Sequence, residues 1–111
     1  MTDATLDKFK GKVLDISGMA VYQDDSIVSN EILKAKTGTV TVFAFDKGQG
    51  LSEHTAPFDA MVQILDGSAK IIIGGVPHTV KAGQGIIMPG NVSHALTADE
   101  RFKMLLTMIR S

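Results

Sequence analysis

The sequence predicts an all-β domain, either a two-sheet sandwich or a closed barrel, and three observations support this prediction. Short runs rich in β-branched and aromatic residues follow one another from residue 37 onward. Glycine-containing turns separate these runs, and no run in this part of the chain has the period of an amphipathic helix. Short strands at this turn spacing are typical of all-β sandwiches and barrels.

The expected strands can be read in order along the chain. They are TVTVFAF (39–45), AMVQIL (60–65), AKIII (69–73), HTV (78–80), IIM (86–88) and FKMLLTMI (102–109). The turns DKGQG, DG, GG, KAGQG and PGN follow the first five runs in that order. In the first run, Val40 and Val42 point to one side and Phe43 and Phe45 to the other, because side chains alternate along a strand. We therefore expect both faces of this strand to be covered by a second sheet or a second subunit.

The first 36 residues carry weaker patterns. Residues 13–16 and 26–29 could each form a short strand, residues 30–35 favour a strand, and ATLDKFKGKV could form one helical turn or an extended arm. With 111 residues the chain is expected to be a single domain. We divide it into an N-terminal arm with edge strands (1–36) and a barrel (37–111).

Composition excludes several classes of function. The formal net charge is −1 with acidic and basic residues mixed, so no basic surface for nucleic acid is expected. The chain has no cysteine, which excludes disulfides, thiolate metal sites and thiol nucleophiles. No apolar run approaches the ~20 residues of a membrane span, and the N-terminal residues lack the pattern of a signal peptide. We expect a cytoplasmic protein without nucleic-acid or membrane partners.

Two histidines are placed where a metal site could form. His54 follows the loop KGQGLSE, where a strand is expected to begin, and His94 follows a proline-containing turn, where another begins. Imidazoles at matching ends of two strands in a small barrel could face each other across its mouth. Two or three imidazoles with a carboxylate bind zinc, iron or manganese. The alternative is that His54 and His94 are polar residues at strand ends that form hydrogen bonds to the backbone or to water, without a metal.

These residues lie in two stretches that resemble the motifs of the cupin family, G-x5-H-x-H-x3-4-E-x6-G and G-x5-P-x-G-x2-H-x3-N. The second motif matches from Gly83 through Pro89 to His94, with Asn91 at the usual glycine and Ala98 at the usual asparagine. The first motif matches in Gly48, His54 and Gly67. Residues 48–109 therefore resemble a small single-domain cupin, which implies a double-stranded β-helix, or jelly-roll barrel.

The ligand set implied by the resemblance is incomplete. Ala56 stands at the second histidine of the first motif, and Ala60 stands at the carboxylate. Asp59 is the leading replacement, because Pro57 breaks strand geometry just before it. Its alternative role is that of a turn residue bonded to its own backbone. Gln63 is a weaker candidate that should face outward by strand alternation.

Further candidates for the pocket are mostly apolar. Met61, Met88, Met104 and Met108 lie in expected strands, where methionine can line a flexible pocket or simply fill gaps in the core. Phe58 follows a proline on a turn and could cap the barrel mouth or pack against a second subunit. His78 lies near the far hairpin and is expected at the surface or in an interface.

Two classes of function are open, the first implied by the resemblance and the second suited by the mostly apolar composition. In the first, His54, His94 and Asp59 or solvent hold Fe, Mn, Ni or Zn for an oxygenase- or isomerase-type reaction on a small molecule. A metal-free isomerase would need one of these histidines as its base. In the second, the barrel is a non-catalytic, metal-free module that binds or senses a small molecule. We also expect a homodimer, because several strands are apolar on both faces and the arm buries little surface alone.

Overall fold

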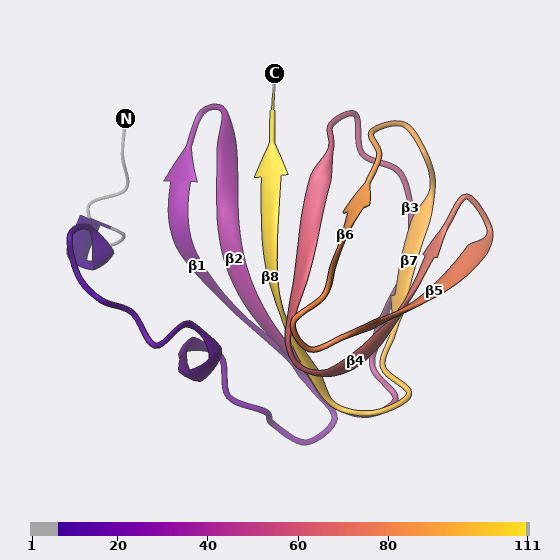
Figure 1. Ribbon diagram of the computed structural model, residues 1–111, viewed down its shortest axis with the longest axis horizontal. Coiled ribbons are helices and arrows are strands. Elements are labelled where there is room, and N and C mark those ends of the chain that lie inside the picture. Colours follow the sequence, from indigo (N-terminus) through magenta and orange to yellow (C-terminus); the bar gives the residue numbers. More distant parts are fainter. Residues whose placement is uncertain (1–6, 111) are drawn as a thin grey trace.

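A computed structural model describes residues 7–110, and its regular structure there is β-strand apart from two short 3-10 helices (Figure 1). The 3-10 helices are η1 (Asp7–Phe9) and η2 (Ile16–Met19). The strands are β1 (Ile27–Ala35), β2 (Gly38–Phe45), β3 (Gly50–His54), β4 (Ala60–Ile73), β5 (Val76–Lys81), β6 (Gly85–Met88), β7 (His94–Thr97) and β8 (Phe102–Ile109). The all-β prediction is confirmed, and the strand expected at 102–109 has the predicted limits.

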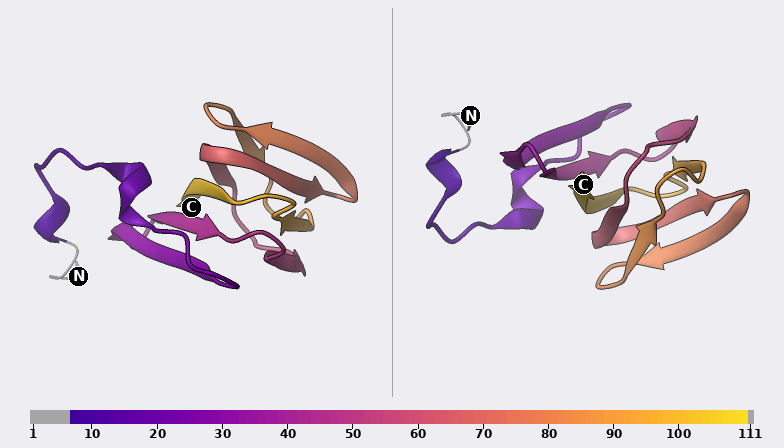
Figure 2. Two further views of the ribbon diagram at one scale, coloured as in Figure 1. Left: turned by 90° about the horizontal axis from the view of Figure 1, so that it is seen from below. Right: turned by 90° about the horizontal axis from the view of Figure 1, so that it is seen from above.

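The strands form one curled sheet in the order β1-β2-β8-β4-β7-β3, with β5 and β6 also paired to β4. The first half of β4 pairs with β8 and β6, and its second half pairs with β5 and β7. The long strand β4 therefore belongs to two layers. We call β1, β2, β8, β6 and the first half of β4 the first layer, and the remaining strands the second layer. Views from below and above show the N-terminal segment to one side of these strands (Figure 2).

The Asp66-Gly67 pair does not form the hairpin turn that separates two strands in the sequence prediction. The chain continues through it as one strand, and the pairing of β4 with β8 shifts register between Ile64 and Asp66. Gly67 has φ +72, and a Cβ atom there would collide with the carbonyl oxygen of Arg101. A glycine is thus required where β4 passes from one layer to the other.

The main core lies between the two layers. Phe45 stacks on Phe102 with 4.5 Å between ring centroids, and both rings are fully buried. Further large side chains that are fully buried in this cluster come from β4, β7 and β8, and they are Val62, Ile64, Ile71, Leu96 and Met104. Apolar residues at every second position of β4 supply this core from both halves of the strand. The layers thus enclose a barrel interior.

A second apolar cluster lies on the outer face of the first layer. Ala20, Ile32, Val42 and Ala44 are buried there, and Phe9, Ile16 and Met19 of the N-terminal segment pack against them. The strand expected at 13–16 is absent, and η2 begins at Ile16 instead. The strands expected at 26–29 and 30–35 are one strand, β1. Residues 4–13 were expected as an extended arm, with one helical turn as the alternative, and they contain the 3-10 helix η1; residues 4–6 lie outside the described residues.

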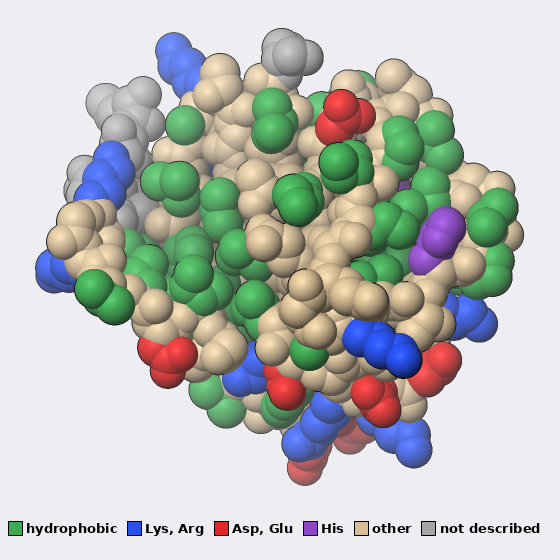
Figure 3. All heavy atoms as spheres, in the orientation of Figure 1, with side chains coloured by type: hydrophobic (Ala, Val, Ile, Leu, Met, Phe, Trp, Pro, Cys, Tyr) green, Lys and Arg blue, Asp and Glu red, His purple; other side chains and the backbone are tan. Residues whose placement is uncertain are grey.

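Polar contacts fasten the N-terminal segment to the lower end of the barrel. Arg101 donates to the buried carboxylate of Asp46 at 2.6 Å and to Asp24 at 2.8 Å, which holds the pKa of Asp46 below its usual range. The Tyr22 hydroxyl donates to Asp66 at 2.5 Å, and Lys103 donates to the carbonyl of Ser17. Charged side chains gather along this lower edge (Figure 3). Within residues 7–110, no helix is long and apolar enough to cross a membrane.

Candidate functional site

The two motif histidines meet at the upper end of the barrel. The strand β3 ends at His54, β7 begins at His94, and the two residues are opposite each other in the antiparallel pairing of these strands. The sequence prediction placed His54 at the start of a strand, and the structure places it at the end of one. Its position opposite His94 follows from this antiparallel arrangement, because the end of one strand lies beside the start of the other.

The imidazole rings face each other edge to face. Their Nε2 atoms are 3.1 Å apart, the ring centroids are 4.3 Å apart, and the ring planes are inclined by 68°. The ring of His94 is buried, with 7% of the residue exposed, whereas His54 lies at the exposed rim. One ligand could therefore contact both Nε2 atoms while remaining accessible from the barrel mouth.

The other ring nitrogens determine which tautomers are possible. The Nδ1 atom of His54 is 2.8 Å from the carbonyl of Ser52, so Nδ1 carries the hydrogen and the Nε2 lone pair is free. The Nδ1 atom of His94 is 3.4 Å from the carbonyl of Val92, which is a weak contact. His94 can therefore carry its hydrogen on either nitrogen. If it is on Nε2, His94 donates to His54; if it is on Nδ1, two Nε2 atoms that both carry lone pairs lie 3.1 Å apart and favour a bound cation.

Burial lowers the pKa of His94 below its ordinary 6.5, and the electrostatic effect of the neighbouring His54 lowers it further. A hydrogen bond to the carbonyl of Val92 opposes this effect only in part. The imidazole of His94 is therefore neutral at pH 7. A neutral imidazole is the form that binds a metal ion or accepts a proton.

A small apolar pocket adjoins the imidazole pair. Its volume is about 80 Å³, and it is lined by Leu51, His54, Ala56, Phe58, Ala60, Met88, His94, Leu96, Met104, Leu106 and Met108. Ligand pockets commonly measure about 300–1,000 Å³, so this one has room only for an ion or a molecule of a few atoms. Among these lining residues, the two histidines are the only titratable ones.

The structure brings together some of the predicted pocket residues and separates others. Phe58, Met88, Met104 and Met108 line the pocket with the histidines. Met61 and Gln63 line a different hollow, beside Gly83 and Gly85 on the outer face of the first layer. They point away from the barrel interior because they alternate with the inward residues Ala60, Val62 and Ile64 along β4.

Asp59 lies outside this pocket as well. Its Oδ1 atom accepts a hydrogen bond from the backbone N–H of Gly90 at 2.8 Å, and the residue lines a hollow with Pro57 and Asn91. Ala56 and Ala60 border the pocket without a replacing carboxylate beside them. Residues 7–110 hold no group of three or more His, Cys, Asp or Glu side chains that could bind a metal. Among the described residues that line this pocket, His54 and His94 are the imidazole donors, and none is a carboxylate.

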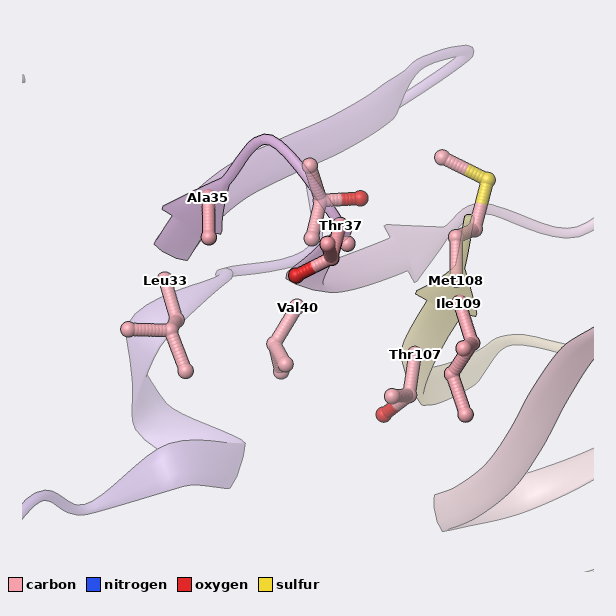
Figure 4. A pocket seen from close by; sticks show the side chains of 9 residues that line it. Leu33, Ala35, Thr37, Val40, Thr107, Met108 and Ile109 are labelled. Carbon is pink, nitrogen blue, oxygen red and sulfur yellow. The ribbon is translucent and has the colours of Figure 1, made fainter. Parts of the chain in front are cut away.

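The remaining candidates lie elsewhere. His78 is exposed on β5 and does not line the pocket. A larger hollow of about 320 Å³ lies near the β1–β2 turn and the end of β8, where Leu33, Val40 and Ile109 surround it (Figure 4). Leu51, Leu96 and Leu106 were missed as pocket residues. The alternation of side chains along β8 could have predicted that Leu106 faces inward. The strands β3 and β7, which carry Leu51 and Leu96, are too short to show such a pattern.

Asn91 explains one departure from the cupin motif. Its φ is +64, in the left-handed region that glycine adopts freely and that asparagine tolerates better than most residues. Its backbone N–H donates to the carbonyl of Ala56 at 2.7 Å. Asparagine at the usual glycine position therefore preserves the turn that carries the chain into His94.

Comparisons with known proteins agree with this geometry. The cupin domain family matches residues 41–109, which include β3 to β8 and both histidines. Protein SchB of Streptomyces halstedii is 31% identical over 61 residues, which cover 54% of this chain and 44% of that protein. The match thus spans less than half of this curated relative.

Solved structures extend the likeness over nearly the whole chain. A conserved protein of unknown function from Streptococcus pyogenes is 40% identical, with a TM-score of 0.86 over 91% of this chain and 89% of that one. A cupin 2 conserved barrel domain protein from Leptotrichia buccalis is 37% identical, with a TM-score of 0.85 over 87% of this chain and 47% of that one. The predicted jelly-roll barrel is confirmed.

Proposed function

Because this chain belongs to the cupin domain family, we propose that its barrel pocket binds a metal ion between His54 and His94, together with a small molecule. The supporting observation is the pair of facing Nε2 atoms, 3.1 Å apart. Two metal–nitrogen bonds of about 2.0–2.1 Å that meet at about 90–110° place their nitrogen atoms about 2.8–3.4 Å apart. The observed spacing lies within this range.

The backbone contacts of the two rings favour the same proposal. Histidines that bind metals commonly donate their other N–H to a carbonyl or carboxylate, which fixes the ring and its tautomer. The Nδ1 atom of His54 donates to Ser52 in this way, and that of His94 faces the carbonyl of Val92. Both Nε2 atoms then carry lone pairs at a separation of 3.1 Å, and a cation bound to both removes the repulsion between them.

The family suggests Fe, Mn, Ni or Zn, and for these divalent ions the protein supplies two nitrogen donors. Catalytic zinc sites usually have three protein ligands, so a divalent ion here requires oxygen donors from water or a small molecule. The pocket of about 80 Å³ has room for them. When bound, such an ion supplies Lewis acidity. The oxygenase- or isomerase-type reaction that the resemblance implies stays a prediction.

Elemental analysis of untagged protein tests the proposal. The protein is expressed in medium that contains all four metals, and wild type is compared with His54→Ala, His94→Ala and His78→Ala. We expect about one ion per chain in wild type and in His78→Ala, which removes an exposed histidine outside the pocket. Both pocket variants should lose the ion. Metal-free wild type that also refuses added ions, or an ion retained in both pocket variants, contradicts the proposal.

A second candidate function is metal-free binding of a small molecule. It is favoured by the lining of the pocket, where nine of eleven residues are apolar. A ligand with one polar group would bond to the imidazole pair and place its apolar part against the methionines. A compound that raises the melting temperature in the presence of a strong chelator would support this function, and the rise should vanish in His94→Ala.

A further inference from the structure

The pocket offers sulfur donors beside its two imidazoles. Met88, Met104 and Met108 all line it, so half of the six methionines in the chain gather at this one site. Methionine in a core often only fills space. At this site, however, the thioethers share a cavity with two imidazoles whose Nε2 atoms converge.

Strand register places two of these methionines around the missing carboxylate. Ala60 on β4 pairs with Met88 on β6 and with Met108 on β8, one on each side. Ala60 is the position at which the cupin motif has its acidic ligand, and an alanine side chain is too short to bind anything. The side chains that flank it on the same inner face end in thioether sulfurs.

We propose that this pocket is a site for cuprous ion, Cu(I), held by His54, His94 and the thioether of Met88 or Met108. The inference rests on the two-imidazole site proposed above and adds a third donor to it. Thioether sulfur is a soft ligand that selects Cu(I), and imidazole binds copper as well, whereas carboxylate and water suit harder ions. Cu(I) is stable with few ligands, so the short donor set is sufficient for it.

The surroundings favour a monovalent soft ion over a divalent hard one. The lining contains no carboxylate, hydroxyl or amide side chain, and transfer of a doubly charged ion into such an environment costs more than transfer of a singly charged one. Asp59, which the sequence suggested as the replacement ligand, instead accepts a hydrogen bond from the backbone N–H of Gly90. The chain has no cysteine, so thioethers are its only sulfur donors.

An anaerobic titration with Cu(I) tests this inference on the full chain, with bicinchoninate as a competing chelator of known affinity. Wild type is compared with Met88→Leu, Met108→Leu and the double variant, because leucine keeps the volume and removes the sulfur. Met61→Leu is the matched control, since Met61 lies on the outer face of the same strand as Ala60. We expect one Cu(I) per chain in wild type and the control, and an affinity lower by at least about tenfold in the double variant.

X-ray absorption at the copper edge gives an independent readout of the ligands. We expect a copper–sulfur distance in wild type that is lost in the double variant, while zinc affinity is unchanged by either substitution. The copper–sulfur distance in wild type keeps the test decisive if the double variant fails to fold, because its absence alone overturns the inference. Ag(I), which is soft and does not change oxidation state under these conditions, should bind with the same dependence on the methionines.

The outcomes separate the two proposals. Binding of zinc or manganese without binding of Cu(I) overturns the inference and leaves the proposed function standing. Cu(I) bound with unchanged affinity in the double variant, and without a sulfur signal, also overturns it. If neither a divalent ion nor Cu(I) binds, both proposals fail together.

Discussion

The carboxylate of Asp59 accepts a hydrogen bond from the backbone N–H of Gly90 and thereby ties together the two loops at the barrel mouth. A second bond, from the N–H of Asn91 to the carbonyl of Ala56, joins the same loops. One loop follows His54 and the other precedes His94. Two hydrogen bonds therefore join the loops that flank the imidazoles, and the bond between Asn91 and Ala56 remains when the bond to Asp59 is removed.

The variant Asp59→Ala distinguishes this structural role from the ligand role expected from sequence. Loss of one hydrogen bond between exposed loops should lower the free energy of unfolding by about 1 kcal/mol. Metal affinity should stay within about twofold of wild type, because the carboxylate does not line the pocket. Urea denaturation and metal titration measure the two quantities. A loss of affinity of about tenfold or more would contradict this prediction.

Tyr22 gives a prediction for alkaline pH. Burial raises the pKa of its hydroxyl well above the ordinary 10.0, and the hydrogen bond to Asp66 raises it further. A group with a raised pKa in the folded state contributes stability that is complete below its unfolded pKa and is lost as pH rises toward the folded value. The free energy of unfolding should therefore fall as pH increases above about 10.

Absorbance of the phenolate measures this titration directly, because the chain has one tyrosine and no tryptophan. Tyr22 should remain protonated at pH 10 as long as circular dichroism shows folded protein. In Asp66→Asn the phenolate should appear at lower pH, since the substitution removes a negative charge beside the hydroxyl. Glu100→Gln is the control, because Glu100 has the smallest of the effects on Tyr22. Appearance of phenolate near pH 10 in folded wild type would contradict the prediction.

The site could be predicted only in part, and β3 shows why. This strand, GLSEH, is an exposed edge with only Leu51 turned partly inward, so it has no hydrophobic alternation for a sequence pattern to detect. Its pairing with β7 nevertheless decides where His54 points. The sequence also could not predict that Met88 and Met108 lie on either side of Ala60, because this depends on the register of three strands. In contrast, β8 is long, apolar and bounded by polar residues, and its limits follow from the pattern alone.

Gly67 shows a second limit and gives a prediction on stability. Asp-Gly between two apolar runs resembles a hairpin turn, whereas here it forms the bend at which β4 passes between layers. Gly67→Ala places a methyl group against the carbonyl oxygen of Arg101 and forces a side chain into the left-handed region. The second effect alone costs about 1–3 kcal/mol. We expect Gly67→Ala to destabilise the protein more than Gly83→Ala.

Gly83 is the matched control for this substitution, because it has φ +86 and no atom near its missing Cβ. The difference between the two variants therefore measures the collision with Arg101 and not the backbone strain. Denaturant unfolding of both variants gives the two values. Equal destabilisation in the two proteins would show that the backbone at Arg101 moves away without cost.

The outer face of the first layer leads to a prediction on assembly. Leu33, Met61, Ile87 and Ile109 are between 42% and 61% exposed there, and Leu33 and Ile109 also line the hollow of Figure 4. Hydrophobic side chains also gather over β1, β2 and β8 in Figure 3. None of these residues is charged, so two copies can place this face together without like-charge repulsion. We propose that the protein is a homodimer formed through this face, since isolated monomers seldom expose a large apolar patch.

Sedimentation at micromolar concentration tests the dimer and its location. Wild type should sediment as a dimer, whereas Ile87→Glu and Ile109→Glu should sediment as monomers, because each places a carboxylate opposite an apolar surface. Val76→Glu is the control, since Val76 is 56% exposed but lies on β5 in the second layer. Sedimentation of wild type as a monomer would contradict the proposed homodimer. Dissociation of Val76→Glu to the same extent would instead move the interface away from the first layer, because a substitution remote from the contact should leave the association unchanged.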